Sequence, residues 1–290
     1  MATSFTNQAT LRYNGEAVQS NITVGLIEGM LSVSKQAVEE QYAAGDTVTY
    51  VVSIVNNGGA ALSGLTVTDN LGAYAFGAGT VQPLTYNTGS VQYYVDGVLQ
   101  PDPNVSSADG LALSGISVPA AGNVTIIYSA TVNEYAPLET GSSVTNTVTV
   151  SGTDVTEATA EESIAVTNAA DLSILKSVTP IPVAENGRLT YTFQLFNSGN
   201  TAVLETDNAV ITDTFDPVLT DIAVTLNGAA LTIGTDYSYD ENTGEFSTAE
   251  GVIAIPAASY TQDAATGAWS MTPGAATLTV TGTIGAVTAP

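Results

Sequence analysis

The stretch TVTYVVSIV, residues 47–55, places an apolar side chain at every second position and mostly Thr or Ser between them. The same alternation recurs in LTVTDNL (65–71), NVTIIYSATV (123–132), SVTNTVTV (143–150), LTYTFQLF (189–196) and ATLTVTGTI (276–284). Gly, Asn, Asp and Pro separate these runs, which is typical of antiparallel strands joined by turns. So many short strands predict an all-β chain built from β-sandwiches. Only AVEEQYAAG (37–45) suggests a helical turn.

The chain contains an internal repeat. LSVSKQ (31–36) matches LSILKS (172–177), and fifteen residues after each Lys stands a Tyr, from Lys35 to Tyr50 and from Lys176 to Tyr191. The other matching pairs are Asn56 in VNNGG with Asn197 in FNSGN, LTVTDNL with VITDTF (210–215), YVDGVL (94–99) with TLNGAAL (225–231), and NVTIIYSATV with ATLTVTGTI. We therefore expect two tandem Ig-like antiparallel β-sandwich domains, residues 30–168 and residues 169–290.

The two predicted domains end differently. After NVTIIYSATV the first continues with SSVTNTVTVSGTDVTEATAEESIAVTN (142–168), whereas ATLTVTGTI is followed by only six residues. The N-terminus resembles this missing end, because residues 4–35 align with residues 143–176 and place Asn7 on Asn146, with a two-residue difference that a turn can absorb. Asn14-Gly15 is a strong hairpin signal. Residues 1–29 are therefore predicted to be a donor segment carrying the strands that the second domain lacks.

A sandwich without its closing strands exposes a sheet edge, and a strand from another chain can complete it. We predict that residues 1–29 complete the second domain of a neighbouring copy, because closure within one chain requires a sharp bend. The donor strand has a core-seeking stripe on one face, formed by Phe5, Ala9, Leu11 and Tyr13. Such a contact propagates head to tail into a homopolymer. The alternatives are a frayed arm, or pairing with the first domain.

Composition excludes several classes of function. Lys and Arg number 4 against 28 Asp and Glu, and the net charge of −24 opposes binding to nucleic acid or to an anionic membrane. The absence of Cys and His excludes disulfides, Cys/His metal sites and His-based catalysis. The acidic stretch TDYSYDENTGEF (235–246) lacks the spacing of a calcium loop. We expect no metal, cofactor, small-molecule substrate or membrane insertion, and the N-terminus does not read as a secretory signal.

Three polar residues of each unit fall on the apolar side of a strand. They are Lys35, Asp69 and Asn146 in the first domain, and Lys176, Asp213 and the donor residue Asn7 in the second. Burial lowers the pKa of a Lys and raises that of an Asp, so a neutral amine can attack the Asn carboxamide while the acid transfers protons. The product is a Lys–Asn isopeptide bond with release of ammonia. The alternative is a buried Lys–Asp ion pair with the Asn hydrogen-bonded nearby.

The ordered set LSVSK, GDTVTYVVSIVNNG, LTVTDNL and VTNTVTV resembles the conserved repeat domains of bacterial surface proteins, and the isopeptide-forming domains of Gram-positive pilins and adhesins. The resemblance covers nearly the whole chain and implies extracellular, Ig-like structural modules. It further implies two cross-links: Lys35–Asn146 assisted by Asp69 within the first domain, and Lys176–Asn7 assisted by Asp213 between subunits. This sequence departs from such pilins because it shows no signal peptide, sorting motif or membrane tail, which argues against sortase-based assembly.

Three functions are compatible with these features. We expect a non-enzymatic structural subunit of an extracellular filament at the cell surface, in which Asp69 and Asp213 serve only the autocatalytic cross-links. The alternative is an adhesin or stalk module whose exposed hairpins bind a host or matrix ligand. A carbohydrate-active enzyme is disfavoured, since no pair of carboxylates in the sequence forms a recognisable glycosidase constellation.

Overall fold

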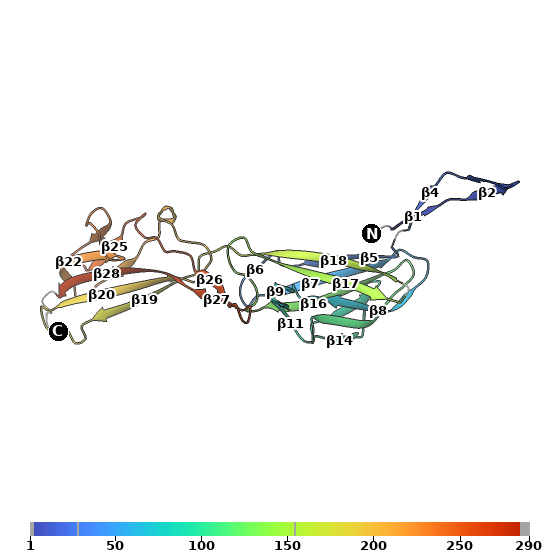
Figure 1. Cartoon of the computed structure of the whole chain (residues 1–290). Coiled ribbons are helices and arrows are strands. Elements are labelled where there is room, and N and C mark those ends of the chain that lie inside the picture. Colours follow the sequence, from blue (N-terminus) through green and yellow to red (C-terminus); the bar gives the residue numbers. More distant parts are fainter. Residues whose placement is uncertain (1–2, 28, 154, 285–290) are drawn as a thin grey trace. The chain divides into compact units, whose positions relative to one another are not determined.

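The structure is a computed structural model that describes residues 3–27, 29–153 and 155–284. The chain forms two compact units, the first with residues 1–137, 142–166 and 264–268, and the second with residues 138–141, 167–263 and 269–290. Strands dominate both (Figure 1), and the single helical segment of the described ranges is the 3-10 turn η1 (Glu205–Asp207). The all-β prediction is confirmed. The helical turn expected at 37–45 is wrong, because β6 (Gln41–Tyr42) forms there and pairs with another strand.

The first unit consists of two sheets. One has the strand order β13-β12-β16-β7-β5, with β11 also paired to β16, and the other has the order β14-β15-β8-β17-β18-β6, while β9 and β10 pair separately. The strands are β5 (Leu31–Ala37), β7 (Thr47–Asn56), β8 (Leu62–Asp69), β9 (Tyr74–Phe76), β10 (Gly79–Val81), β11 (Leu84–Tyr86), β12 (Gln92–Val95), β13 (Val98–Gln100), β14 (Asn104–Ser106), β15 (Leu111–Val118), β16 (Asn123–Val132), β17 (Ser143–Gly152) and β18 (Val155–Val166).

Alternation along the strands builds the core of the first unit. In β7, Val48, Tyr50, Val52 and Ile54 are buried, while the residues between them are partly or fully exposed. Each such side chain contributes about 1.5–3 kcal/mol when it leaves water. The closing strands β17 and β18 carry the same pattern, and β18 lies against β5 of the opposite sheet. The sandwich of the first unit is therefore covered on both sides of its core.

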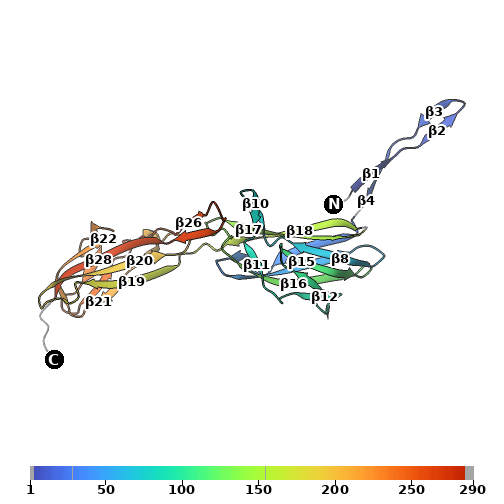
Figure 2. The same cartoon turned by 60° about the horizontal axis from the view of Figure 1, so that its bottom comes forward.

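The second unit also contains two sheets, with the orders β19-β20-β28-β22-β23 and β21-β25-β24, and a separate pair β26-β27 (Figure 2). The strands are β19 (Leu172–Thr179), β20 (Arg188–Asn197), β21 (Thr212–Thr214), β22 (Leu219–Leu226), β23 (Ala229–Ala230), β24 (Tyr237–Tyr239), β25 (Glu245–Thr248), β26 (Ser259–Gln262), β27 (Trp269–Thr272) and β28 (Gly274–Ile284). By the sequence repeat, β19, β20, β21 and β28 correspond to β5, β7, β8 and β16.

The second unit has an open edge where the first unit has its closing strands. In the first unit, β8 pairs with β15 on one side and with β17 on the other. The corresponding strand β21 pairs with β25 alone among the strands that the structure describes. One side of β21 is therefore left without a partner strand over the described ranges.

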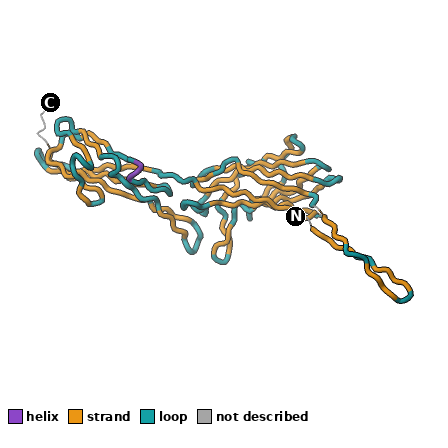
Figure 3. Tube along the Cα trace, turned by 90° about the horizontal axis from the view of Figure 1, so that it is seen from above, coloured by secondary structure: helices purple, strands orange, loops and turns teal. Residues whose placement is uncertain are grey.

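The N-terminal segment forms a ribbon of two strand pairs. β1 (Thr3–Asn7) pairs with β4 (Thr23–Ile27), and β2 (Thr10–Tyr13) pairs with β3 (Glu16–Gln19). Asn14 and Gly15 at its tip have φ angles of 49° and 87°, so the predicted hairpin turn is confirmed. Figure 3 shows the two strands running to this tip, and they pair with no strand of residues 29–153 or 155–284. We call residues 3–27 the N-terminal hairpin. No helix in the described ranges is long and apolar enough to cross a membrane.

Candidate functional site

Lys35 and Asp69 meet in the core of the first unit. Lys35 lies in β5 of one sheet and Asp69 at the end of β8 in the other, and their side chains are 0% and 2% exposed. Nζ of Lys35 donates a hydrogen bond to Oδ2 of Asp69. The other carboxylate oxygen of Asp69 accepts the backbone N–H of Leu71 at 3.0 Å. The ion pair is therefore excluded from solvent, and hydrogen bonds fix both oxygens of its carboxylate.

Asn146 of β17 joins this pair through a tyrosine. Its Nδ2 donates to the hydroxyl of Tyr128 at 3.1 Å, and its Oδ1 accepts the backbone N–H of Gly72 at 3.2 Å. The Tyr128 hydroxyl also accepts from Lys35 Nζ at 3.0 Å and donates to Asp69 Oδ2 at 2.5 Å. The structure thus brings the three predicted residues of the first domain into one buried hydrogen-bond network.

Tyr128 is the member of the network that the sequence reasoning missed. It lies in β16 and faces the core together with Val124 and Ile126. In the alternating sequence of this strand it therefore looks like an ordinary core residue. The available signal was its hydroxyl, a polar group on the apolar face of the strand. Its ring stacks on Tyr50, with the centroids 5.5 Å apart.

Burial sets the protonation of this network. Desolvation lowers the pKa of Lys35 from 10.5 to about 8, although attraction to Asp69 opposes the change. Desolvation raises the pKa of Tyr128 and of Tyr50 above their ordinary value, so both hydroxyls stay protonated at neutral pH. The neutral amine of Lys35 therefore becomes accessible near physiological pH, beside a carboxamide whose oxygen already accepts a hydrogen bond.

In a chain whose Lys35 has not formed a cross-link, this residue makes the free energy of unfolding depend on pH. Below about pH 8 the amine is protonated in both the folded and unfolded chain, and between about 8 and 10.5 it is protonated only in the unfolded chain. The free energy of unfolding of an Asn146→Ala variant should therefore rise from pH 8 to 10, by up to about 1.4 kcal/mol per pH unit. Urea denaturation at several pH values measures this. A Lys35→Met/Asn146→Ala variant is the control, and an equal rise in both would contradict the assignment.

Lys176 and Asp213 form the equivalent pair in the second unit. Nζ of Lys176 donates to Oδ2 of Asp213. Three aromatic rings surround the ammonium, with its nitrogen 4.6 Å from the ring centroid of Tyr191, 5.4 Å from that of Phe193 and 5.3 Å from that of Phe215. The side chain of Lys176 is nevertheless 40% exposed and that of Asp213 17%. Lys176 is therefore partly exposed in the single chain, and its burial by the donor segment of a neighbouring copy stays a prediction.

The exposure has a clear structural cause, because β19 presents its apolar residues to solvent. Leu172 is 51% exposed and Ile174 is 58% exposed, whereas Leu31, which corresponds to Leu172, is 8% exposed in β5. In the first unit β18 covers β5, but no described strand covers β19. Lys176 and the apolar residues beside it therefore form an uncovered core face, which we call the open face of the second unit.

The N-terminal hairpin reproduces the pairing of the closing hairpin β17–β18. In the closing hairpin Asn146 pairs with Glu162, and in the N-terminal hairpin Asn7 pairs with Thr23 at the corresponding place. Next to the turn, the pair Gly152–Val155 corresponds in the same way to the pair Tyr13–Glu16. One offset of 139 residues maps all four residues onto their counterparts. Both hairpins also change register by one residue between the two pairs. The two-residue difference of the alignment therefore lies between each hairpin and the strand that follows it.

The predicted donor residues are all exposed within the single chain. Phe5 is 51%, Leu11 71% and Tyr13 75% exposed, and Ala9 is exposed as well. Asn7 is exposed and pairs with Thr23 of the same hairpin, and its placement beside Lys176 stays a prediction. The Phe5 ring lies over Gly25, the residue opposite it, where a Cβ would come within 2.3 Å of the ring. Phe5 and Gly25 thus replace the inward pair Val144 and Ile164 of the closing hairpin.

The two repeated asparagines beside Gly-containing turns have a structural role. Asn56 and Asn197 are buried, and each Nδ2 donates to backbone carbonyls. The acceptors are Ala60, Val118 and Pro119 for Asn56, and Thr201 and Pro256 for Asn197. Each Oδ1 accepts the N–H of a residue two positions later, at 2.9 and 3.0 Å. They therefore fix the loop that follows β7 and β20 and take no part in the Lys–Asp networks.

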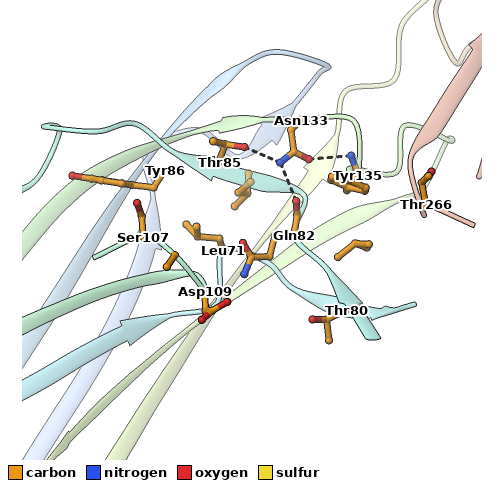
Figure 4. Close-up of a pocket in the computed structure, with 13 residues that line it drawn as sticks. Leu71, Thr80, Gln82, Thr85, Tyr86, Ser107, Asp109, Asn133, Tyr135 and Thr266 are labelled. Carbon is orange, nitrogen blue, oxygen red and sulfur yellow. Dashed lines mark hydrogen bonds between the residues drawn. The ribbon is translucent and has the colours of Figure 1, made fainter. Parts of the chain in front are cut away.

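A shallow recess of the first unit offers little chemistry (Figure 4). Asn133 beside it donates to the carbonyl of Gln82 and the hydroxyl of Thr85, both at 2.9 Å, and accepts the N–H of Tyr135 at 3.0 Å. These bonds fix the loop after β16. The described residues also contain no cluster of three or more acidic side chains that could bind a metal ion. We assign no ligand to the recess.

Comparisons with known proteins find similarity in structure alone. No protein-family model matches the sequence. No curated protein matches it either. Similar solved structures include the pilus backbone protein RrgB of Streptococcus pneumoniae, with 15% identity over 84% of this chain and 55% of that chain and a TM-score of 0.34. The major pilin subunit BcpA of Bacillus cereus has 11% identity over 94% of this chain and 73% of that chain, with a TM-score of 0.37.

A collagen-binding subdomain of the Enterococcus faecalis surface protein ACE is also similar, with 10% identity over 49% of this chain and 99% of that chain and a TM-score of 0.30. The chain spans about half, 55%, of the length of the S. pneumoniae protein. Pilin and adhesin structures are thus among those to which this chain is similar. TM-scores below 0.5 transfer no function, so the function is inferred from the residues of this chain.

Proposed function

We propose that this protein is the structural subunit of an extracellular filament, assembled head to tail by donor-strand complementation. One observation carries the proposal. The N-terminal hairpin shares the pairing register of β17–β18 over β1–β4 and next to its turn, and the second unit leaves open the core face that β17 and β18 cover in the first unit. Both surfaces expose apolar side chains in the single chain. Each surface therefore supplies what the other lacks.

The repeat defines how the hairpin would enter the second unit. In the first unit β17 pairs with β8, with Val148 opposite Asp69 and Val150 opposite Val67. The same register on β21 sets Ala9 opposite Asp213 and Leu11 opposite Ile211. Asn7 would then take the place of Asn146, beside the pair formed by Lys176 and Asp213. The second strand of the hairpin would cover Leu172 and Ile174 as β18 covers β5.

The chain order makes the contact propagate. Five residues separate the end of β18 at Val166 from the start of β19, and three residues separate the end of β4 at Ile27 from the start of β5. A hairpin that closes one sandwich therefore leads directly into the first strand of the next sandwich in both places. When the recipient is a second copy, each added subunit brings a new open face, and the assembly is a heterologous, growing polymer.

We further propose that isopeptide bonds lock this polymer, Lys35–Asn146 within a subunit and Lys176–Asn7 between subunits. In each, Nζ attacks Cγ of the carboxamide, the new C–N bond forms, the Cγ–Nδ2 bond breaks, and ammonia leaves. Starting from the ion pair, the products are an amide, ammonia and a protonated Asp, so no buried charge remains. Each bond lowers the mass by about 17 Da. The geometry in the first unit supports the first bond, and the repeat supports the second.

Deletion of residues 1–29 tests the assembly. The full chain should form filaments visible by electron microscopy, and the deletion variant should remain a monomer, because its second unit keeps the open face without a donor. Circular dichroism of the variant checks that the first unit stays folded. Added peptide of residues 1–29 should bind this variant and raise its melting temperature, while a peptide of the same composition in scrambled order should not.

Two outcomes would overturn the proposal. A full-length chain that stays a monodisperse, stable monomer would indicate a stalk or adhesin module instead. Filaments of unchanged abundance from the deletion variant would show that residues 1–29 do not make the contact between subunits. Either result is readable by size-exclusion chromatography with light scattering on the same samples.

A further inference from the structure

Tyr128 holds a position that no other group of the described network shares. Its hydroxyl forms hydrogen bonds with the amine of Lys35, the carboxylate of Asp69 and the carboxamide nitrogen of Asn146, at 3.0, 2.5 and 3.1 Å. These are the nucleophile, the acid and the leaving group of the proposed reaction. The side chain is 2% exposed, and its stacking on Tyr50 fixes the ring. The hydroxyl therefore lies between the attacking nitrogen of Lys35 and the leaving nitrogen of Asn146.

The leaving nitrogen of Asn146 needs a proton to depart as ammonia, and its hydrogen-bond partner is Tyr128 and not Asp69. Asp69 contacts the Lys35 nitrogen and the Tyr128 hydroxyl. A phenol that accepts a proton on one side and donates one on the other connects these two positions, as in general acid–base catalysis through an intermediate group.

We propose that Tyr128 is a catalytic residue of the Lys35–Asn146 cross-link and relays the proton from Asp69 to the leaving nitrogen. Lys35 first gives a proton to Asp69 and attacks Cγ of Asn146 as a neutral amine. Asp69 then protonates the Tyr128 oxygen while the Tyr128 O–H proton passes to Nδ2, and ammonia leaves. The second proton lost by the former lysine nitrogen returns to Asp69. Tyr128 ends as it began, and this inference rests on the proposed cross-link.

The second unit has Val280 in place of the relay tyrosine, and a different pair of aromatic residues stacks there. In the β7–β16 pair Tyr128 stands opposite Tyr50, and in the β20–β28 pair Val280 stands opposite Tyr191. Phe215, which aligns with Leu71, stacks on Tyr191 instead, with the centroids 4.9 Å apart. The aromatic packing is thus retained without a hydroxyl at this place. We expect the bond between subunits to form more slowly than the bond within one.

The rate of mass loss in newly made chains tests the relay. Full-length chains from cell-free translation are quenched in acid at intervals, and their intact mass is measured. Wild type should lose about 17 Da, and Tyr128→Phe should do so about 100-fold more slowly, within the range that a positioned acid–base group supplies. Tyr93→Phe is the matched control, since the Tyr93 hydroxyl bonds to the backbone of Ser117 and not to the network, and it should mature at the wild-type rate.

A gain of function covers the case in which Tyr128→Phe does not fold. The double substitution Val280→Tyr and Phe215→Leu gives the second unit the residues found in the first, and it should speed the appearance of SDS-resistant oligomers about tenfold or more. Tyr128→Phe maturing at the wild-type rate would overturn the relay while leaving the cross-link intact. Wild-type chains that never lose 17 Da would instead overturn the cross-link, and the relay with it.

Discussion

Moving the N-terminal hairpin to the C-terminal end of the chain should convert a filament-forming protein into a monomer. The rearranged chain begins at residue 29 and carries residues 3–27 after Ile284, joined by a linker copied from residues 133–142. In the first unit this linker connects β16 to β17. Because β28 corresponds to β16, the relocated hairpin should close its own second unit as β17 and β18 close the first.

The expected gain in stability is large, since two apolar surfaces leave water together. Leu172, Ile174, Phe5 and Leu11 are all more than half exposed in the single chain. Burial of such side chains contributes about 1.5–3 kcal/mol each, before the cost of ordering the segment. The second unit of the rearranged chain should therefore melt more than about 10 °C above that of the chain lacking residues 1–29.

Light scattering and calorimetry check this result together. The matched control is the same rearranged chain with Leu11→Asp in the relocated hairpin, which should melt like the deletion variant because a charge would enter the core. Continued polymerisation of the rearranged chain would show that another surface joins the subunits. A monomer that melts no higher than the deletion variant would show that the hairpin does not complete the second unit.

The repeat made much of this arrangement predictable from the sequence. Alternation in TVTYVVSIV and its relatives was sufficient for the all-β fold, since period two leaves only strands as an explanation. Matching Lys35 with Lys176, and Asn146 with Asn7, identified the groups that occupy equivalent places. The Asn14-Gly15 turn was also readable, because only a few residue types adopt positive φ at both central positions.

The rest depends on contacts that the sequence pattern does not contain. Tyr128 reads as a core residue, and only the position of its hydroxyl among three partners reveals a chemical role. Lys176 is partly exposed because no strand among the described residues covers β19, although LSILKS closely resembles LSVSKQ. The pairing of Phe5 with Gly25 across two strands was likewise invisible, because a large residue and a small one compensate only when register places them opposite each other.

Asn7→Ala should abolish covalent ladders while leaving filaments in place. The substitution removes the carboxamide that Lys176 would attack, but it leaves the backbone of β1 and the apolar residues Phe5 and Leu11 unchanged. Donor-strand pairing therefore still joins the subunits. Boiling in SDS should reduce wild-type filaments to a ladder of oligomers and Asn7→Ala filaments to monomer alone, as gel electrophoresis and electron microscopy of the same sample would show.

The two proposed bonds can be separated by their two asparagines. Asn146→Ala should keep the ladders and lose the mass decrease of about 17 Da in the monomer, whereas Asn7→Ala should keep the mass decrease in the monomer and lose the ladders. Ladders that survive in Asn7→Ala would place the intersubunit bond on a different donor residue. Ladders that vanish in Asn146→Ala as well would mean that the first unit must be locked before it can present the hairpin to its neighbour. The opposite responses are expected because Asn7 and Asn146 occupy the same position in two hairpins, one of which remains with its own chain while the other is given to the next.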